Sequence, residues 1–518
     1  MKNFILSLSV FLLCYQTLEA QPVHTYHNPV IAGDLPDPTV IRVENTYYAA
    51  GTSSDFAPNY PLYESTDLIN WKQIGHIFNE LPAWTSDSFW APELYYHNGT
   101  FFVYYTAKRR GDRVSCIGVA TTKDIHNGFT DHGIIIEWGN EAIDAFIFQD
   151  EDGKNYISWK AYGLTRERPI EILCSELSDD GLALKGEHFT LTDHSKGWRG
   201  AGDEGQCLVK HGAYYYHLYS IGGCCDNRCD YRVAVSRSKN LRGPWEQAPT
   251  PILQGGDEWR CTGHGTLVTT PDGRYFYLYH AYHATNFEFI GRQAMLDELV
   301  WDEQSQWPKF KSGPNPSLQA PVPFAGTQQV RETGFYDDFS SEKSNTLWQW
   351  DLNLPRPDYQ VKDGELILSS TTRGLAFVGL RPQVGNYVLK TEVSDGSAAK
   401  KGICIYGNQR NFLAFGCYPE GLIIFKSENG IRSELAAVKP AQRLPFFLKA
   451  EVLNGRYYQF FWSHDNETWI PVKIGDEYAV DGKFLPQWGV AMRAGLFVEG
   501  EVPLTAKFSE LSIDYRFE

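Results

Sequence analysis

The sequence predicts an all-β protein, a five-bladed β-propeller followed by a β-sandwich. Three observations lead to this prediction. Short strands rich in aromatic residues follow one another through polar turns along the 518 residues. One hairpin unit recurs in the N-terminal part, and a linker rich in Pro, Gly and Ser separates that part from a second set of strands. Long apolar runs with a 3.6-residue period, which would predict helices, are almost absent.

The recurring unit is an apolar strand, a turn containing Asn, Gly or Asp, and a second strand rich in aromatic residues. Its copies begin roughly 50 to 60 residues apart, at Asp37, Trp90, Asp144, Glu204 and His264. Further strand pairs follow some copies, which brings the unit to four strands. Five such units are typical of a five-bladed propeller, in which the first strand of each blade lines a central channel. Side chains at the start of these strands should therefore converge.

The chain is expected to divide into three parts. Residues 1–20 are a predicted signal peptide, 21–320 the propeller and 333–518 the sandwich. The linker lies within KFKSGPNPSLQAPVPFAGTQQVRE and carries no strand pattern. Beyond it, stretches such as GELILSS and FFLKAEV alternate between apolar and polar residues, as strands of a β-sandwich do.

The N-terminal segment has the features of a secretory signal. A basic Lys2 precedes an apolar run, and the small Ala20 ends the segment. The run is too short to span a bilayer, and no other segment is a candidate span. The bulky Leu13 before Cys14 does not suit lipid attachment, so we do not expect a lipoprotein. The predicted location is secreted or periplasmic.

The composition limits the class of partner. A net charge of −16 and a pI near 5.4 argue against nucleic acid and anionic membranes, both of which need a basic surface. Aromatic residues make up 14% of the chain, which suits stacking on the apolar faces of sugar rings. Strand propensity alone can also enrich aromatic residues in a large β-protein.

Ten cysteines occur, and three of them lie in the stretch CCDNRC, Cys224 to Cys229. A disulfide in an exported loop is favoured there. A metal site is the alternative, although no second cysteine pair or histidines at ligand spacing accompany the stretch. Without Cys14 the number is odd, so at least one thiol lacks an intrachain partner.

Four acids and one histidine share the phase of the repeat: Asp37, Glu93, Asp144, Glu204 and His264. Carboxylates brought together raise the pKa of at least one of them, so a neutral acid and an ionised base can coexist. Two carboxyl groups on either side of a bond are what glycoside hydrolysis requires. The alternative for any single acid is a solvated turn residue.

Two further features bear on the site. Trp90 and Phe146 could stack on a sugar, and core packing between blades is the alternative for each. Asp37 lies between two prolines, which restrict its backbone and suit a carboxylate that positions one water. Asp34 falls out of phase and is expected to be a surface charge.

Six stretches spread over the N-terminal part resemble glycoside hydrolase family 43: NPVIAGDLPDP, WAPE, IDAFIFQDEDGK, DEGQCLVKHGAYYYHLYS, GHGTLV and GRQAMLDELVWDEQSQWP. The resemblance implies hydrolysis with inversion by three acids. Asp37 would be the general base, Glu204 the general acid, and Asp144 the acid that orients Glu204 and tunes its pKa. Where the family often has a proline, this chain has Gln206.

The resemblance also implies substrate contacts. Arg292 would contact substrate, with a salt bridge to a nearby acid as the alternative. His264 would lie near the propeller axis, where a structural Ca²⁺ is possible and would be held mostly through water. A hydrogen-bonded core histidine is the alternative. The C-terminal part resembles the concanavalin A-like (jelly-roll) sandwich of family β-xylosidases and arabinofuranosidases.

The expected protein is thus an exo-acting, inverting hydrolase that removes terminal β-D-xylose or α-L-arabinofuranose from an oligo- or polysaccharide and requires no cofactor. Two alternatives remain at this point. One is a retaining fructan or sucrose hydrolase on a five-bladed fold, and the other is a propeller that binds sugar without cleaving it.

Overall fold

The computed structural model describes residues 24–162, 170–193, 203–341, 346–370, 374–419, 421–440, 446–500 and 504–517. Strands dominate this part of the chain. Helical structure within it is limited to a 3-10 turn at Ile125–Asn127 and the short α1 (Phe287–Ile290). The all-β prediction is confirmed. The predicted signal peptide lies outside the described residues.

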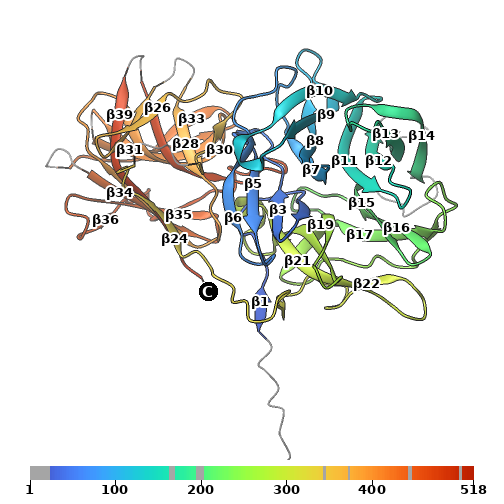
Figure 1. Cartoon of the computed structure of the whole chain (residues 1–518). Coiled ribbons are helices and arrows are strands. Elements are labelled where there is room, and N and C mark those ends of the chain that lie inside the picture. Colours follow the sequence, from blue (N-terminus) through green and yellow to red (C-terminus); the bar gives the residue numbers. More distant parts are fainter. Residues whose placement is uncertain are drawn as a thin grey trace, which may run out of the picture.

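A four-stranded antiparallel unit recurs along the N-terminal part, coloured blue to yellow-green in Figure 1. The first unit is a sheet of β2 (Thr39–Val43), β3 (Thr46–Ala50), β5 (Asn59–Ser65) and β6 (Lys72–Phe78). The next two units join into one sheet through a parallel pairing of β11 with β9. Their strands are β7 (Trp90–His97), β8 (Thr100–Lys108), β9 (Ser115–Thr122), β10 (Thr130–Ile136), β11 (Glu141–Gln149), β12 (Asn155–Tyr162), β13 (Ile170–Leu177) and β14 (Leu184–Asp193).

Two further four-stranded sheets complete the N-terminal part. Their strands are β15 (Glu204–His211), β16 (Tyr214–Ile221), β17 (Arg232–Ser238) and β18 (Glu246–Gln247), then β19 (Trp259–Thr269), β20 (Tyr275–His283), β21 (Arg292–Trp301) and β22 (Pro308–Phe310). The first strands β2, β7, β11, β15 and β19 touch one another in that order, and β19 touches β2 again. The first strands of all these units therefore surround one axis.

The two ends of this part are held together. β1 (Thr25–His27) pairs antiparallel with β23 (Gln319–Pro321). Next to this pair, the Asn28 side chain donates to the carbonyl oxygens of Leu296 and Ser317, at 3.0 Å each. The buried amide links the start of the chain to its last unit and closes the ring of sheets.

Two large sheets make up most of the described C-terminal part, which is coloured from golden yellow to red in Figure 1. One contains β24 (Gly334–Asp337), β26 (Tyr359–Lys362), β27 (Glu365–Ser369), β29 (Tyr387–Val393), β34 (Phe446–Leu453), β35 (Tyr457–Ser463), β36 (Ile470–Pro471), β37 (Ala479–Asp481) and β39 (Thr505–Tyr515). The other contains β28 (Ala376–Leu380), β30 (Lys400–Asn408), β31 (Asn411–Tyr418), β32 (Gly421–Glu428), β33 (Ile431–Val438) and β38 (Arg493–Glu499).

One apolar core joins these two sheets. Leu389 and Leu448 of the first sheet and Ile403 and Leu496 of the second belong to a single buried cluster. The burial of β34 alternates along the strand, as expected where one face of a sheet packs and the other meets water. In contrast, β16 is buried on both faces because sheets pack on either side of it.

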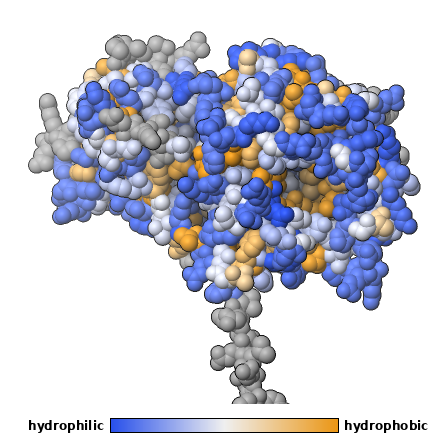
Figure 2. Space-filling model, in the orientation of Figure 1, coloured by the Kyte–Doolittle hydropathy of each residue, from blue (hydrophilic) through white to orange (hydrophobic). Residues whose placement is uncertain are grey.

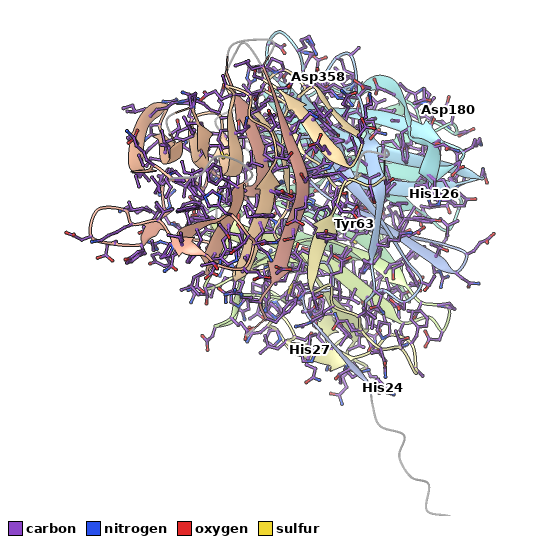
Figure 3. The ribbon with its side chains drawn as sticks, turned by 90° about the vertical axis from the view of Figure 1, so that its left-hand side faces the viewer. His24, His27, Tyr63, His126, Asp180 and Asp358 are labelled. Atoms are coloured by element: carbon purple, nitrogen blue, oxygen red, sulfur yellow. A yellow bond between two sulfur atoms is a disulfide. The ribbon has the colours of Figure 1, made fainter. Side chains whose placement is uncertain are left out.

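The two parts of the chain are in direct contact. β25 (Trp350–Asp351) pairs with β4 (Phe56–Ala57) of the first unit. Arg381 donates to Gln73 Oε1 at 2.7 Å and to the hydroxyl of Tyr63, which Figure 3 labels. Hydrophilic residues cover much of the face in Figure 2, interspersed with hydrophobic ones. In the part that the structure describes, no helix is long and apolar enough to cross a membrane.

Candidate active site

Each first strand carries, within it or just before it, one residue with the same unusual backbone conformation. Asp37, Ala91, Asp144, Gly205 and His264 have φ angles of 51°, 39°, 58°, 56° and 44°. In β7, β11, β15 and β19 this residue lies within a register shift, where the pairing with the second strand skips residues. Irregularities of this kind redirect side chains, and positive φ is uncommon for residues other than glycine. The repeat therefore directs one residue per unit towards the axis.

The side chains at these positions meet. His264 Nδ1 lies 3.4 Å from Asp37 Oδ1 and 3.9 Å from Asp144 Oδ2. The Gly205 amide donates to Asp144 Oδ2 at 3.3 Å. A Cβ on Gly205 would lie 2.7 Å from His264 Cγ, so only glycine fits here. Asp37, Asp144 and His264 thus come together as the repeat predicts, and Glu204 stands one residue before the equivalent position.

Glu93 does not occupy the equivalent position, which Ala91 fills two residues earlier. Its carboxyl instead accepts from Thr39 Oγ1 at 2.7 Å and from the Ile147 amide at 3.5 Å. Burial raises the pKa of Glu93 to about 8, so this side chain is protonated at neutral pH. Glu93 therefore links neighbouring units and carries no charge into the site.

Asp37 is surrounded by groups that favour its ionised form. Its Oδ1 lies 2.9 Å from Arg292 Nη1, and its Oδ2 accepts from Thr52 Oγ1 at 2.7 Å. The Asp37 amide donates to Nδ1 of His280 at 3.1 Å. Burial opposes ionisation, but Arg292 and, to a smaller extent, His264 hold the pKa of Asp37 well below its usual range. Burial also lowers the pKa of His280 to about 4, which keeps that ring neutral.

Glu204 and Asp144 lie in contrasting surroundings. Glu204 Oε2 is 2.6 Å from Lys160 Nζ, and Oε1 accepts from the Tyr231 hydroxyl at 2.8 Å. Burial opposes ionisation of Glu204, but Lys160 and Tyr231 lower its pKa. Burial, together with repulsion by Glu204 and Asp37, raises the pKa of Asp144 to about 6. The two carboxyls interact, so one proton on the pair resides preferentially on Asp144 in the free protein.

A family model described as glycosyl hydrolases family 43 matches residues 26–308, the region that carries this site. The chain belongs to glycosyl hydrolase family 43. Xylan 1,3-beta-xylosidase of Vibrio sp is 29% identical over 495 residues, 86% of this chain and 90% of the relative. The non-reducing end alpha-L-arabinofuranosidase BoGH43B of Bacteroides ovatus is 26% identical over 396 residues, 71% of each chain.

Solved structures agree with this assignment. A mutant of the GH43 protein BlXynB from Bacillus licheniformis superposes with a TM-score of 0.82 at 26% identity, covering 95% of this chain and 100% of that one. The protein is therefore a glycoside hydrolase of the β-xylosidase and α-L-arabinofuranosidase type, as its sequence motifs indicated.

The remaining predicted residues of this family 43 hydrolase lie in different surroundings. Arg292 is buried, and its Nη2 also donates to the Gly489 carbonyl of the C-terminal part at 3.5 Å. Trp90 is half-buried at the start of β7, with Lys108 Nζ 5.4 Å from the centre of its ring. Phe146 lies in a hydrophobic core cluster between units. A stacking role remains a prediction for both aromatics, and the position of Phe146 favours the core-packing alternative.

Asp34 corrects an expectation from the sequence. It is buried, not a surface charge, and its Oδ2 lies 3.4 Å from Arg493 of β38. Its Oδ1 accepts from the Arg292 amide at 3.3 Å, and its carbonyl accepts from Arg381 at 2.8 Å. The repeat could not reveal this burial, because two partners of Asp34, Arg381 and Arg493, lie in the C-terminal part.

Sequence reasoning missed Lys160, Tyr231, His280 and Thr52. Lys160 lies on β12 and His280 on β20, the second strands of their units, and Thr52 follows β3. These residues hold the charged groups of the site, but none has the phase of the first strands. A buried lysine within the apolar stretch YISWKAY was the one available signal, since lysine is rarely buried without a partner.

The loop with three cysteines contains disulfides, as favoured from the sequence. Cys224 is bonded to Cys225, and Cys229 to Cys261. The remaining described cysteines are free and buried: Cys116, Cys174, Cys207, Cys404 and Cys417. The prediction of at least one unpaired thiol is confirmed.

The donors around His264 do not match a calcium site. Ca²⁺ takes six to eight oxygen ligands. The Nδ1 of His264 faces two carboxylates, and Arg292 already neutralises one of these. Among the described residues, no group of three or more His, Cys, Asp or Glu side chains is arranged to hold a metal ion.

Proposed function

We propose that this family 43 hydrolase is a secreted, exo-acting enzyme that removes terminal β-D-xylose or α-L-arabinofuranose from plant oligo- or polysaccharides with inversion at the anomeric carbon. The observation that carries the proposal is the contrast between two carboxyls of one site. Arg292 at 2.9 Å stabilises the charge of Asp37, whereas Glu204 belongs to a pair with Asp144 that can hold a proton. A base and an acid of this kind are what single displacement requires.

Asp37 is the proposed general base. Its low pKa keeps it ionised at neutral pH, and contacts to Thr52 and Arg292 fix its orientation. A water held by Asp37 attacks the anomeric carbon and gives one proton to the carboxylate. The new bond joins water oxygen to carbon on the face opposite the leaving group, so the configuration inverts. The carboxyl groups of Asp37 and Glu204 should be about 6.5–9.5 Å apart, which leaves room for the water.

Glu204 is the proposed general acid, and it donates a proton to the leaving oxygen as the glycosidic bond breaks. In the free protein the Lys160 contact at 2.6 Å favours ionised Glu204. Asp144, whose pKa is raised to about 6, is the neighbouring carboxyl that holds the proton in the free protein. Substrate shields the pocket from water and raises the cost of charge on Glu204, so the proton of the pair moves to Glu204. After release, Asp37 returns its proton to solvent and the pair takes one up.

The proposed architecture is a five-bladed propeller over residues 21–320 and a concanavalin A-like sandwich over 333–518. The closed order of first strands around one axis supports the propeller, and the core shared by two sheets supports the sandwich. Residues 1–20 are the proposed signal peptide. Two disulfides support an oxidising location outside the cytoplasm.

The pentose is inferred from the named relatives, which include a β-xylosidase and an α-L-arabinofuranosidase. The purified protein should cleave 4-nitrophenyl β-D-xylopyranoside, 4-nitrophenyl α-L-arabinofuranoside, or both. NMR of the first product formed should show the inverted anomer, whereas a retained anomer would contradict the mechanism. Full activity in both Asp37→Asn and Glu204→Gln would exclude the assigned roles.

A further inference from the structure

The loop between β16 and β17 contains a disulfide that the proposed mechanism does not use. It joins the adjacent residues Cys224 and Cys225. A cross-link stabilises a fold chiefly by closing a loop, and the effect grows with loop length. A bond between neighbours closes almost no loop, so its contribution to fold stability is small. What the bond does change is the local surface of the protein.

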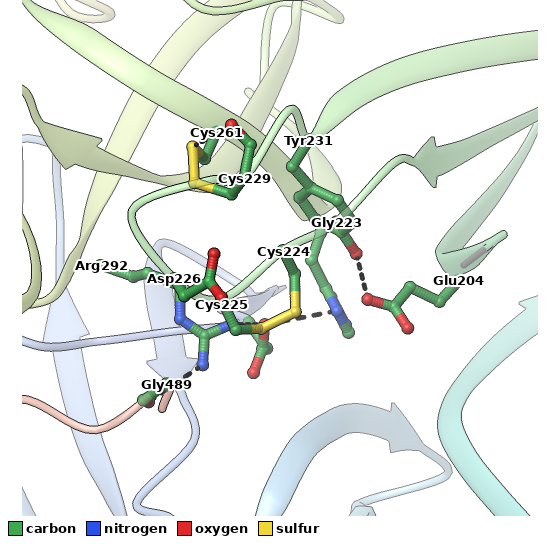
Figure 4. The surroundings of a disulfide bond; sticks show 12 residues. Glu204, Gly223, Cys224, Cys225, Asp226, Cys229, Tyr231, Cys261, Arg292 and Gly489 are labelled. Carbon is green, nitrogen blue, oxygen red and sulfur yellow. Dashed lines mark hydrogen bonds and ion pairs between the residues drawn. A yellow bond between two sulfur atoms is a disulfide. The ribbon is translucent and has the colours of Figure 1, made fainter. Parts of the chain in front are cut away.

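This disulfide lies beside the residues that hold both carboxyls. Figure 4 shows it between Arg292 on one side and Tyr231 with Glu204 on the other. A Cβ built on Gly489 would lie 3.5 Å from Cys225 Cβ and 3.9 Å from Arg292 Nη2. Cys224 packs against the cluster that contains Tyr231, whose hydroxyl donates to Glu204. The disulfide therefore lies near Arg292, which contacts Asp37, and near Tyr231, which contacts Glu204.

The loop is held firmly in this place. The Cys225 carbonyl accepts from the Gly489 amide at 3.0 Å and from the Tyr282 hydroxyl at 3.3 Å. The second disulfide, Cys229–Cys261, ties the loop to β19, the strand that carries His264. A surface fixed in advance binds without further ordering cost.

The chemistry of this surface complements that of its neighbours. Arg292, Asp37 and Glu204 offer charges and hydrogen bonds, which suit sugar hydroxyls. A disulfide has no proton to donate, and cysteine sulfur behaves as a small, polarisable apolar group. Cys225 is buried, and Cys224 is half-buried, which leaves part of the pair accessible. Binding sites for small ligands combine such apolar walls with a few placed polar groups.

We propose that the Cys224–Cys225 disulfide is a binding platform for substrate, which packs against an apolar C–H face of the pentose ring between Asp37 and Glu204. This inference rests on the proposed function, and it adds a specificity element to the same site. The platform contributes to substrate binding and takes no part in proton transfer, so its loss should raise KM more than it lowers kcat.

The test compares Cys224→Ala/Cys225→Ala with a matched control, Cys404→Ala/Cys417→Ala. The control removes two buried thiols on neighbouring strands of the C-terminal part and no disulfide. On the better of the two aryl pentosides, the loop variant should show a KM raised about five- to twentyfold and a kcat within about threefold of wild type. The control should retain wild-type constants, and both variants should unfold near the wild-type Tm.

A second measurement covers a loop variant that does not fold. Folded wild type treated with a phosphine reductant should show the same rise in KM, with mass spectrometry confirming two added hydrogens per opened disulfide. The Cys229→Ala/Cys261→Ala variant lacks the second disulfide. A rise in KM when this variant is treated with the same reductant is therefore assigned to the opening of Cys224–Cys225. An unchanged KM after loss of Cys224–Cys225, or a fall in kcat alone with a lowered Tm, would overturn the platform. Wild type that cleaves neither pentoside would overturn the proposed function, and the platform with it.

Discussion

Lys160 Nζ lies 2.6 Å from Oε2 of Glu204, and both side chains interact with the buried carboxyl of Asp144. This contact places the positive charge of Lys160 against Glu204, the proposed general acid. The Lys160 charge favours the ionised form of Glu204. The neighbouring Asp144, whose pKa is raised to about 6, is therefore the carboxyl that takes up a proton first as the pH falls. In the proposed mechanism, Glu204 therefore depends on Asp144 for the proton that it donates.

Replacement of Lys160 by methionine should shift the pH profile. Without the cation the pKa of Glu204 rises, and a general acid loses activity as pH rises through its pKa. The basic limb of kcat/KM should therefore move to higher pH, by about one unit or more. Lys210→Met is the matched control, since Lys210 pairs with Glu151 outside the site. A basic limb that stays in place, or moves to lower pH, would contradict the assigned contact.

The acidic limb of the pH profile of kcat/KM should depend on Arg292. Arg292→Met removes the charge that holds the pKa of Asp37 down. A general base loses activity as pH falls through its pKa, so the acidic limb of kcat/KM should move to higher pH by about 1–3 units. Arg292→Lys keeps the charge and should shift the limb less. Equal shifts in the two variants would show that the charge of Arg292 does not control Asp37.

Gly205→Ala should damage catalysis through His264. The added Cβ would lie 2.7 Å from His264 Cγ, and the backbone there has a φ of +56°. Displacement of the ring that contacts Asp37 and Asp144 should lower kcat about tenfold or more. Gly212→Ala carries similar backbone strain, at φ +59°, with no atom within 4 Å of the new Cβ. Equal activity in the two alanine variants would show that the close contact does not matter.

Glu93→Gln should make stability less dependent on pH. The pKa of Glu93 is about 8 in the folded protein and 4.5 as the reference value, so the unfolded chain releases this proton at lower pH. Ionisation therefore destabilises the fold progressively between these values, by a few kcal/mol in order of magnitude. Glutamine cannot ionise, so the Tm of the Glu93→Gln variant should exceed that of wild type at pH 8 but not at pH 4. Glu80→Gln, at an exposed position, is the control.

The sequence alone determined which positions of the repeat come together in the site. A repeat fixes where each unit starts, and equivalent starts around one axis must converge, so Asp37, Asp144 and His264 could be grouped without a structure. The motifs around them identified the family. Alternation of apolar and polar residues also predicted the all-β C-terminal part, because one buried face imposes a two-residue period.

Only the tertiary structure decided which charges the site contains. Register shifts in the first strands moved the equivalent position to Ala91 and Gly205, so Glu93 became a buried neutral link and Glu204 stands one residue aside. The partners Lys160, His280 and Arg292 lie on second and third strands, where no period predicts them. Packing across hundreds of residues brings these groups together, and the free energy of each charge depends on the neighbours that packing supplies.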